Sequence, residues 1–144
     1  MSLTNQQKDI IQTTFAQIPD ADHLAVIFYA HLFEIDPSTK PLFRGDMADQ
    51  RKKLIQALAV VVHGIGDLTA IVPAIQQLGK RHVAYGVTPD HWNSVGTALL
   101  MTIEEVFGEA FTEEIRIAWA SAYSLIAETA MAVAYPQLEG LSNG

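Results

Sequence analysis

Apolar residues along this chain recur at spacings of three and four, which is the period of an α-helix, and no segment alternates as a half-buried strand does. Turn and capping residues divide this pattern into separate segments. The segments are 4–18, about 22–33, 37–43, about 47–65, a helix around 71–82, then 89–107 and a last one from 113. We therefore predict an all-α fold of about seven to eight helices.

Local signals at the helix ends support these boundaries. Thr4 and Gln7 have the spacing of a capping box. Asp36-Pro37 and Thr88-Pro89 each place a good N-cap residue before a proline at the first helical position. Gly86 follows the helix around 71–82, and glycine is typical of the position just after a helix. We predict that Gly86 ends that helix.

Two of the predicted helices carry a polar side chain on an otherwise apolar stripe. Gln50 lies on the stripe that includes Leu54 and Leu58, and His82 follows Leu78 by four residues on the next helix. A buried polar group without a partner costs about 1 to 3 kcal/mol, so both should meet something polar, such as a ligand or a metal. The alternative is that His82 is a core histidine with its hydrogen bonds satisfied, which is the commoner case.

Tyr29 lies on a helix face with Ala25 and Phe33. Its hydroxyl could point inward to a site, or the ring could be amphipathic with its tip in water. Both interpretations are open from the sequence. Standard motifs for zinc proteases, serine hydrolases and phosphate-binding loops are absent.

The other histidines give weaker signals. His31 and Glu34 are one helical turn apart, as ligands in di-iron bundles are. The motif occurs once, whereas a di-iron site needs two, so we interpret it as a surface pair. His23, His63 and His91 have no partner at ligand spacing.

The composition fits one globular domain over residues 1–144. Apolar residues make up 49% and charged residues 17%. The longest apolar run, residues 57–62, is far too short to cross a membrane, so we expect no membrane association. The first residues lack the features of a secretory signal, so we expect the protein to be cytoplasmic.

The net charge and the absence of cysteine exclude several functions. A net charge of -7 disfavours nucleic acid as a partner. The absence of cysteine excludes disulfides, thiolate catalysis, iron-sulfur clusters and thioether-linked cofactors, so any cofactor is held non-covalently. Basic residues concentrate in Arg51-Lys52-Lys53 and Lys80-Arg81, which either neutralise an anionic group of a ligand or form solvated helix faces.

Taken together, these residues resemble the globin family, in particular the single-domain bacterial haemoglobins and the haem domain of flavohaemoglobins, with some likeness to neuroglobins. The resemblance extends from Thr4 to about Ala132. The motifs that carry it are Phe28-Tyr29, Leu32-Phe33, Pro37, Phe43, Gln50-Arg51, Leu54, His82, Tyr85, Trp119 and Tyr123. It implies a globin fold whose helices sandwich a haem.

The resemblance also implies roles for particular residues. His82 resembles the proximal axial ligand of a haem b iron, and Phe43 resembles the phenylalanine that packs on the porphyrin face. Lys53 and Lys80 would neutralise the haem propionates. The further residues expected at the cofactor are Leu54, Val87, Trp92 and Val95.

Tyr29 and Gln50 resemble the distal pair of that family, in which both side chains donate hydrogen bonds to dioxygen, and Leu54 resembles a steric gate over the ligand. A charge-assisted bond of about 1.5 to 3 kcal/mol would slow dioxygen release by about ten- to a hundredfold. The resemblance therefore predicts tight, reversible dioxygen binding at a five-coordinate iron, with carbon monoxide and nitric oxide as further ligands. Neuroglobins place a histidine where this chain has Gln50, so closure of the sixth position is not expected.

The chain departs from the flavohaemoglobin pattern on the proximal side. Trp92 and Ala134 stand where that family has a tyrosine and a glutamate that hydrogen-bond the axial histidine. The 144 residues hold no flavin or nicotinamide domain. We therefore expect an oxygen carrier rather than an enzyme. The alternatives are a nitric oxide dioxygenase or peroxidase-like haem protein served by a separate reductase, and a haem-free helical interaction module.

Overall fold

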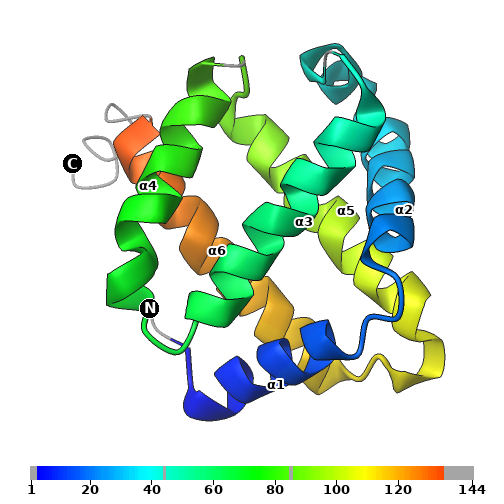
Figure 1. Cartoon of the computed structure of the whole chain (residues 1–144), viewed down its shortest axis with the longest axis vertical. Coiled ribbons are helices and arrows are strands. Elements are labelled where there is room, and N and C mark those ends of the chain that lie inside the picture. The colour runs from blue at the N-terminus through cyan, green and yellow to red at the C-terminus, as the bar shows by residue number, and fades with distance from the viewer. Residues whose placement is uncertain (1–2, 44, 85, 135–144) are drawn as a thin grey trace.

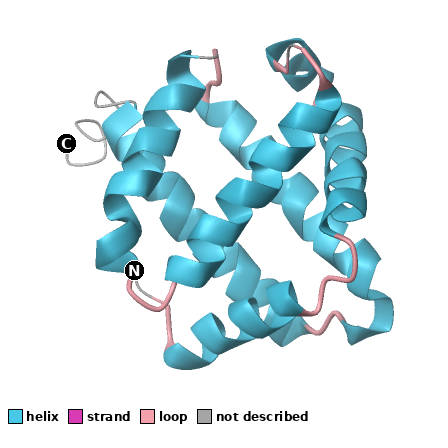
Figure 2. Ribbon diagram, viewed as in Figure 1, coloured by secondary structure: helices cyan, strands magenta, loops and turns pink. Residues whose placement is uncertain are grey.

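The computed structural model describes residues 3–43, 45–84 and 86–134, without the side chains of residues 83, 84, 133 and 134. Tyr85 therefore lies outside the described residues, as does the side chain of Ala134. The described part contains six α-helices, two 3-10 helices and no strand, which confirms the predicted all-α fold (Figure 2). The elements are α1 (Asn5–Ala16), α2 (Ala21–Ile35), η1 (Pro37–Leu42), α3 (Met47–Gly64), α4 (Leu68–Ala84), α5 (Pro89–Phe107), η2 (Gly108–Ala110) and α6 (Glu113–Ala134).

The helix ends mostly follow the local signals. Thr4 and Gln7 exchange the two bonds of a capping box, each 3.0 Å long, which confirms the predicted start of α1. Helix α2 begins at Ala21, one residue before the predicted start, because the carboxylate of Asp20 caps it by accepting a bond from the amide of His23. Asp36 caps the next segment as predicted, and that segment is a 3-10 helix.

Two layers of helices form the molecule. Figure 1 shows α3 and α4 in front of α5 and α6, with α1 across the end where α3 leads into α4. From that turn α3 and α4 diverge, so the start of α3 and the end of α4 lie apart at the opposite end (Figure 1). Among the described residues, no helix has both the length and the apolar character needed to cross a membrane.

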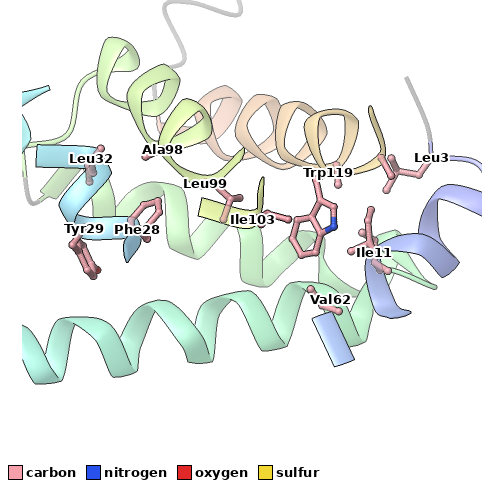
Figure 3. Packing of buried hydrophobic residues seen from close by; sticks show 13 residues of the cluster. Leu3, Ile11, Phe28, Tyr29, Leu32, Val62, Ala98, Leu99, Ile103 and Trp119 are labelled. Atoms are coloured by element: carbon pink, nitrogen blue, oxygen red, sulfur yellow. The ribbon is translucent and has the colours of Figure 1, made fainter. Parts of the chain in front are cut away.

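Buried side chains form two groups. The larger group joins α1, α2, α3, α5 and α6, and within it the ring of Trp119 lies near Ile11, Val62 and Ile103 (Figure 3). The smaller group joins α4, α5 and α6 through Ile75, Trp92, Ala127 and Ala130.

Two glycines let α6 approach its neighbours closely. A Cβ atom at Gly79 of α4 would lie 2.4 Å from the carbonyl oxygen of Ala130, and one at Gly96 of α5 would lie 2.6 Å from the ring of Tyr123. The hydroxyl of Tyr123 also donates a 2.6 Å hydrogen bond to the carbonyl of Trp92. These contacts hold α4 and α5 close against α6.

Candidate functional site

His82 lies near the C-terminal end of α4, one turn after the contact at Gly79, and is half-buried. Its Nδ1 atom is 2.7 Å from the carbonyl oxygen of Leu78. A carbonyl can only accept, so Nδ1 carries the proton and Nε2 carries the lone pair. Burial lowers the pKa of the imidazole, which keeps the ring neutral. This is the protonation state and tautomer in which histidine binds a metal through Nε2.

Trp92 and Val87, both expected at the cofactor, lie beside His82. The ring centroids of Trp92 and His82 are 5.2 Å apart, with the planes tilted by 40°. The amide of Val87 donates a 3.0 Å bond to the His82 carbonyl, and its side chain packs against the smaller buried group. Within the described residues, the buried indole N–H of Trp92 has no hydrogen-bond acceptor.

Tyr29 is buried in α2, and its hydroxyl donates a 3.3 Å hydrogen bond to the backbone carbonyl of Gln50. The ring packs edge-on against Phe43, with centroids 5.1 Å apart, and Phe33 contacts both rings. Burial raises the pKa of Tyr29 to about 12, so the hydroxyl stays protonated at physiological pH. The structure thus brings Tyr29 next to both Phe43 and Gln50. The link to Gln50 is the hydrogen bond from the Tyr29 hydroxyl to the Gln50 backbone carbonyl.

The remaining predicted residues lie on the same helices with different exposure. Leu54 and Val95 are partly buried and pack against the larger buried group. Lys53 and Lys80 are exposed, on α3 and α4. Arg51, from the same basic segment as Lys53, is held by Asp22 of α2 at 2.9 Å.

The α3 stripe is only partly covered by protein. Val62 is the one buried residue of this 18-residue helix. The half-covered positions on the face toward the interior are Met47, Gln50, Leu54, Leu58 and Val61. An apolar stripe of this kind, with neutral His82 on the neighbouring helix, fits a largely apolar ligand.

The sequence predicted the wrong partner for His31. His31 pairs with Glu105 of α5 at 3.2 Å rather than with Glu34. The described residues contain no group of three or more histidine, aspartate or glutamate side chains able to hold a metal ion.

Sequence reasoning also missed contacts between distant segments. It assigned no partner to His91, whose Nε2 lies 3.1 Å from Ser38 Oγ. It used Tyr123 as a motif residue without its bond to Trp92. The sequence carries no local signal for either contact, because each joins residues more than 30 positions apart.

A comparison with models of protein families assigns the chain to one family. The model described as Globin matches residues 26–130. The chain is a globin. This confirms the resemblance drawn from the sequence motifs.

The globin has curated relatives among the flavohaemoproteins. It is 30% identical to one from Bacillus subtilis over 151 residues, covering 99% of this chain and 37% of that protein. It is 34% identical to one from Bordetella parapertussis over 104 residues, covering 70% of this chain and 26% of that protein. The globin thus spans between about a quarter and just over a third of the length of these two relatives.

Solved structures show the same fold. An engineered carbene transferase from Rhodothermus marinus, described as a candidate nitric oxide dioxygenase, superposes with a TM-score of 0.84 at 25% identity, covering 98% of the globin and 99% of that chain. A bacterial globin from Campylobacter jejuni gives 0.80 at 25% identity over 94% and 99%. The carbon monoxide form of haemoglobin from Mustelus griseus gives 0.77 at 18% identity over 90% and 98%, which shows the fold alone.

Proposed function

We propose that this globin binds haem b non-covalently through His82 and binds dioxygen reversibly, with carbon monoxide and nitric oxide as further ligands. The observation that carries the proposal is the state of His82. Its ring is neutral, half-buried and protonated at Nδ1, so Nε2 has the lone pair that an axial ligand needs. Membership of the globin family supports the same cofactor.

The residues present fit haem better than a metal held by protein alone. Haem brings four nitrogen ligands of its own, so one histidine is enough, in keeping with the absence of a metal-binding cluster from the described residues. The partly covered stripe of α3 is apolar, as the macrocycle requires. The side chains that would hold it are Phe43, Leu54, Val87, Trp92 and Val95, with Lys53 and Lys80 for the propionates. When bound, haem supplies an iron atom that coordinates diatomic gases reversibly.

Tyr29 would act as the hydrogen-bond donor for the gas. Its bond to the Gln50 carbonyl is 3.3 Å long, whereas O–H···O bonds are most often about 2.7 to 2.8 Å. The bond is therefore weak, and the hydroxyl can exchange it for one to a ligand at little cost. Because its pKa is raised, Tyr29 stays a donor throughout the physiological range. Gln50, at the start of α3, would be the second donor, and Leu54, one turn further on, would limit access.

The acceptor on His82 favours a carrier over an oxidising enzyme. The Leu78 carbonyl that accepts from Nδ1 is neutral, whereas a carboxylate there would make the imidazole a stronger donor to iron. A second candidate, nitric oxide dioxygenase served by a separate reductase, is supported by the description of the Rhodothermus marinus protein.

The first test compares the absorption spectra of the wild-type protein, His82→Ala and the control His23→Ala, before and after haem and carbon monoxide are added. His23 is an exposed residue of α2. We expect a Soret band that shifts with carbon monoxide in the wild type and the control, and loss or disorder of haem binding in His82→Ala. A normal spectrum in His82→Ala would reject the assigned ligand, and no Soret band in any protein would favour the haem-free module.

The second test concerns Tyr29. Tyr29→Phe should raise the dioxygen dissociation rate by about ten- to a hundredfold and change the carbon monoxide dissociation rate much less. The reason is that bound dioxygen accepts a strong hydrogen bond from the hydroxyl, whereas carbon monoxide does not. Equal changes would reject the donor role. Stopped-flow mixing of the oxygenated protein with nitric oxide then separates the two functions: sustained turnover with added reductase supports the dioxygenase, and a single oxidation supports the carrier.

A further inference from the structure

Four polar side chains outside the proposed pocket join η1 to the beginning of α5. We call Asp36, Ser38, His91 and Ser94 the η1–α5 cluster. Asp36 Oδ1 accepts from the hydroxyl of Ser38 at 2.5 Å and from its amide at 3.2 Å. Asp36 Oδ2 accepts from the hydroxyl of Ser94 at 2.7 Å, and Ser38 Oγ lies 3.1 Å from His91 Nε2.

These contacts determine the tautomer of His91 in two independent ways. Ser38 gives its one hydroxyl proton to Asp36, so it must accept from His91, which places a proton on Nε2. His91 Nδ1 accepts the amide of Thr88 at 3.0 Å, so Nδ1 carries a lone pair. Both arguments agree on the tautomer with the proton on Nε2. The His91 ring therefore connects the start of α5 to η1, because Nε2 donates to Ser38 and Nδ1 accepts from Thr88.

The carboxylate strengthens this connection. Hydrogen bonds from Ser38 and then from Ser94 lower the pKa of Asp36, so the group is charged at neutral pH. Bonds from both hydroxyls are then charge-assisted, and such bonds are roughly twice as strong as neutral ones. Ser38 belongs to η1 and Ser94 to α5, so one charge holds both elements.

The two elements lead to opposite sides of the proposed pocket. Phe43 is the C-cap of η1 and packs against Tyr29. On α5, Trp92 follows His91 directly and lies beside His82. A second contact supports the cluster, because a Cβ at Gly86 would lie 3.5 Å from Leu42 Cδ2 at the end of η1.

A six-residue 3-10 helix does not hold its own position well. Its hydrogen bonds have poorer geometry than those of an α-helix, and such helices are usually shorter. Pro41, inside the helix, also removes an amide donor. External contacts must therefore fix η1, and the cluster supplies them on the side of α5.

We propose that the η1–α5 cluster positions Phe43 and Tyr29 relative to His82, with His91 and Ser38 as positioning residues. Its effect on the cofactor rests on the haem pocket proposed above, whereas its effect on η1 does not. The cluster touches neither the cofactor site nor the gas, and acts through the backbone of η1 and α5.

The test of the structural part is amide hydrogen exchange in the protein without added haem. The amides of Thr39 and Phe43 report on η1, because they donate to Asp36 and Lys40 at 3.0 and 3.2 Å. Ser38→Ala and His91→Ala should each speed their exchange by about three- to tenfold, the scale of one lost hydrogen bond. Ser94→Ala provides a second route, by removing the bond from α5 to Asp36.

His91→Gln distinguishes positioning from simple loss of a ring. Glutamine can donate to Ser38 from its amide nitrogen and accept from Thr88 through its oxygen, so we expect near wild-type exchange. Thr97→Ala is the matched control, since the hydroxyl of Thr97 also lies on α5 and donates to the carbonyl four residues back at 3.1 Å, but contacts no part of the cluster. Unchanged exchange in Ser38→Ala and Ser94→Ala, or the same acceleration in Thr97→Ala, would overturn the proposal.

The functional part is measured in the haem-loaded protein with carbon monoxide. Ser38→Ala and His91→Ala should lose haem to an acceptor protein about three- to tenfold faster and shift or broaden the carbon monoxide stretching band, whereas His91→Gln should restore both. Accelerated exchange with an unchanged band and haem loss would reject the coupling to the pocket. If no variant binds haem, the function proposed above fails, and the exchange data alone decide the role of the cluster.

Discussion

Helices α3 and α5 have nearly the same length, 18 and 19 residues, and each carries an apolar stripe, but they are buried to very different degrees. Val62 is the only buried residue of α3. The buried residues of α5 are Trp92, Gly96, Ala98, Leu99, Thr102 and Ile103. The stripe on α5 is covered by other helices, and the stripe on α3 is covered by them only in part.

The difference comes from what each stripe faces. The α5 stripe contacts α2 and α6, and the ring of Trp119 lies against it near Ile103 (Figure 3). The start of α3 diverges from α4 at the end of the molecule where His82 lies (Figure 1). Two helices that each carry an apolar stripe can therefore be covered by protein to very different degrees.

The largest expected effect is on the α5 side. Ile103→Ala should lower the free energy of unfolding by about 2 to 5 kcal/mol, because the side chain is 2% exposed and its removal leaves a cavity. Urea denaturation followed by circular dichroism measures this. Ile117→Ala on α6, at a site 45% exposed, is the control and should change it by about 0.5 kcal/mol or less. Similar losses in both variants would contradict the assignment of the core.

Gly79 tests the contact that places α4. Gly79→Val should destabilise the protein by about 1 to 3 kcal/mol, because the new side chain collides with the Ala130 carbonyl and α4 must move away from α6. The control is Gly66→Val, since a Cβ at Gly66 meets no atom within 4 Å among the described residues. The same urea experiment applies, and an equal effect at both glycines would disprove the close approach.

High pH should lower the free energy of unfolding through two buried tyrosines, Tyr29, which bonds to α3, and Tyr123, which bonds to α5. Burial raises the pKa of Tyr29 to about 12 and that of Tyr123 further, from an ordinary value near 10. Between pH 10 and 12 the unfolded chain therefore binds fewer protons than the native one, and stability falls as pH rises, by up to about 1.4 kcal/mol per pH unit for each group. Tyr29→Phe should remove one such contribution from the slope of unfolding free energy against pH. Parallel slopes for both proteins would show that Tyr29 is not buried.

The smallest effect is expected on the α3 side. Leu54→Ala should cost about 1 kcal/mol in the protein without haem, because the side chain is only partly covered. Val60→Ala, at a site 53% exposed on the same helix, is the control. Titration with haem should enlarge the difference between Leu54→Ala and wild type. A cost equal to that of Ile103→Ala would remove the contrast between the two helices.

The sequence was sufficient where the determining contact is local. Thr4 and Asp36 cap their helices as predicted, because an N-cap bonds an amide two or three residues away. The helical period likewise fixes which side chains share a face, so Gln50 lies with Leu54 and Leu58 on one side of α3, and His82 lies with Leu78 on one side of α4.

The sequence was insufficient where two helices must first pack. His31 lies one turn from Glu34 but pairs with Glu105, because α2 and α5 are neighbours. The contact of His91 with Ser38 likewise depends on where η1 lies against α5. Such pairs are decided by the geometry of packing, which a single sequence does not encode in any short motif.

The ring of Tyr123 occupies the space where Gly96 lacks a side chain, and its hydroxyl reaches the carbonyl of Trp92 four residues earlier. Neither position can change by itself: a larger residue at 96 would displace the ring, and a smaller one at 123 would leave a void against a bare backbone. Among globins descended from a common ancestor with this chain, we therefore expect substitutions at positions 96 and 123 to arise as pairs.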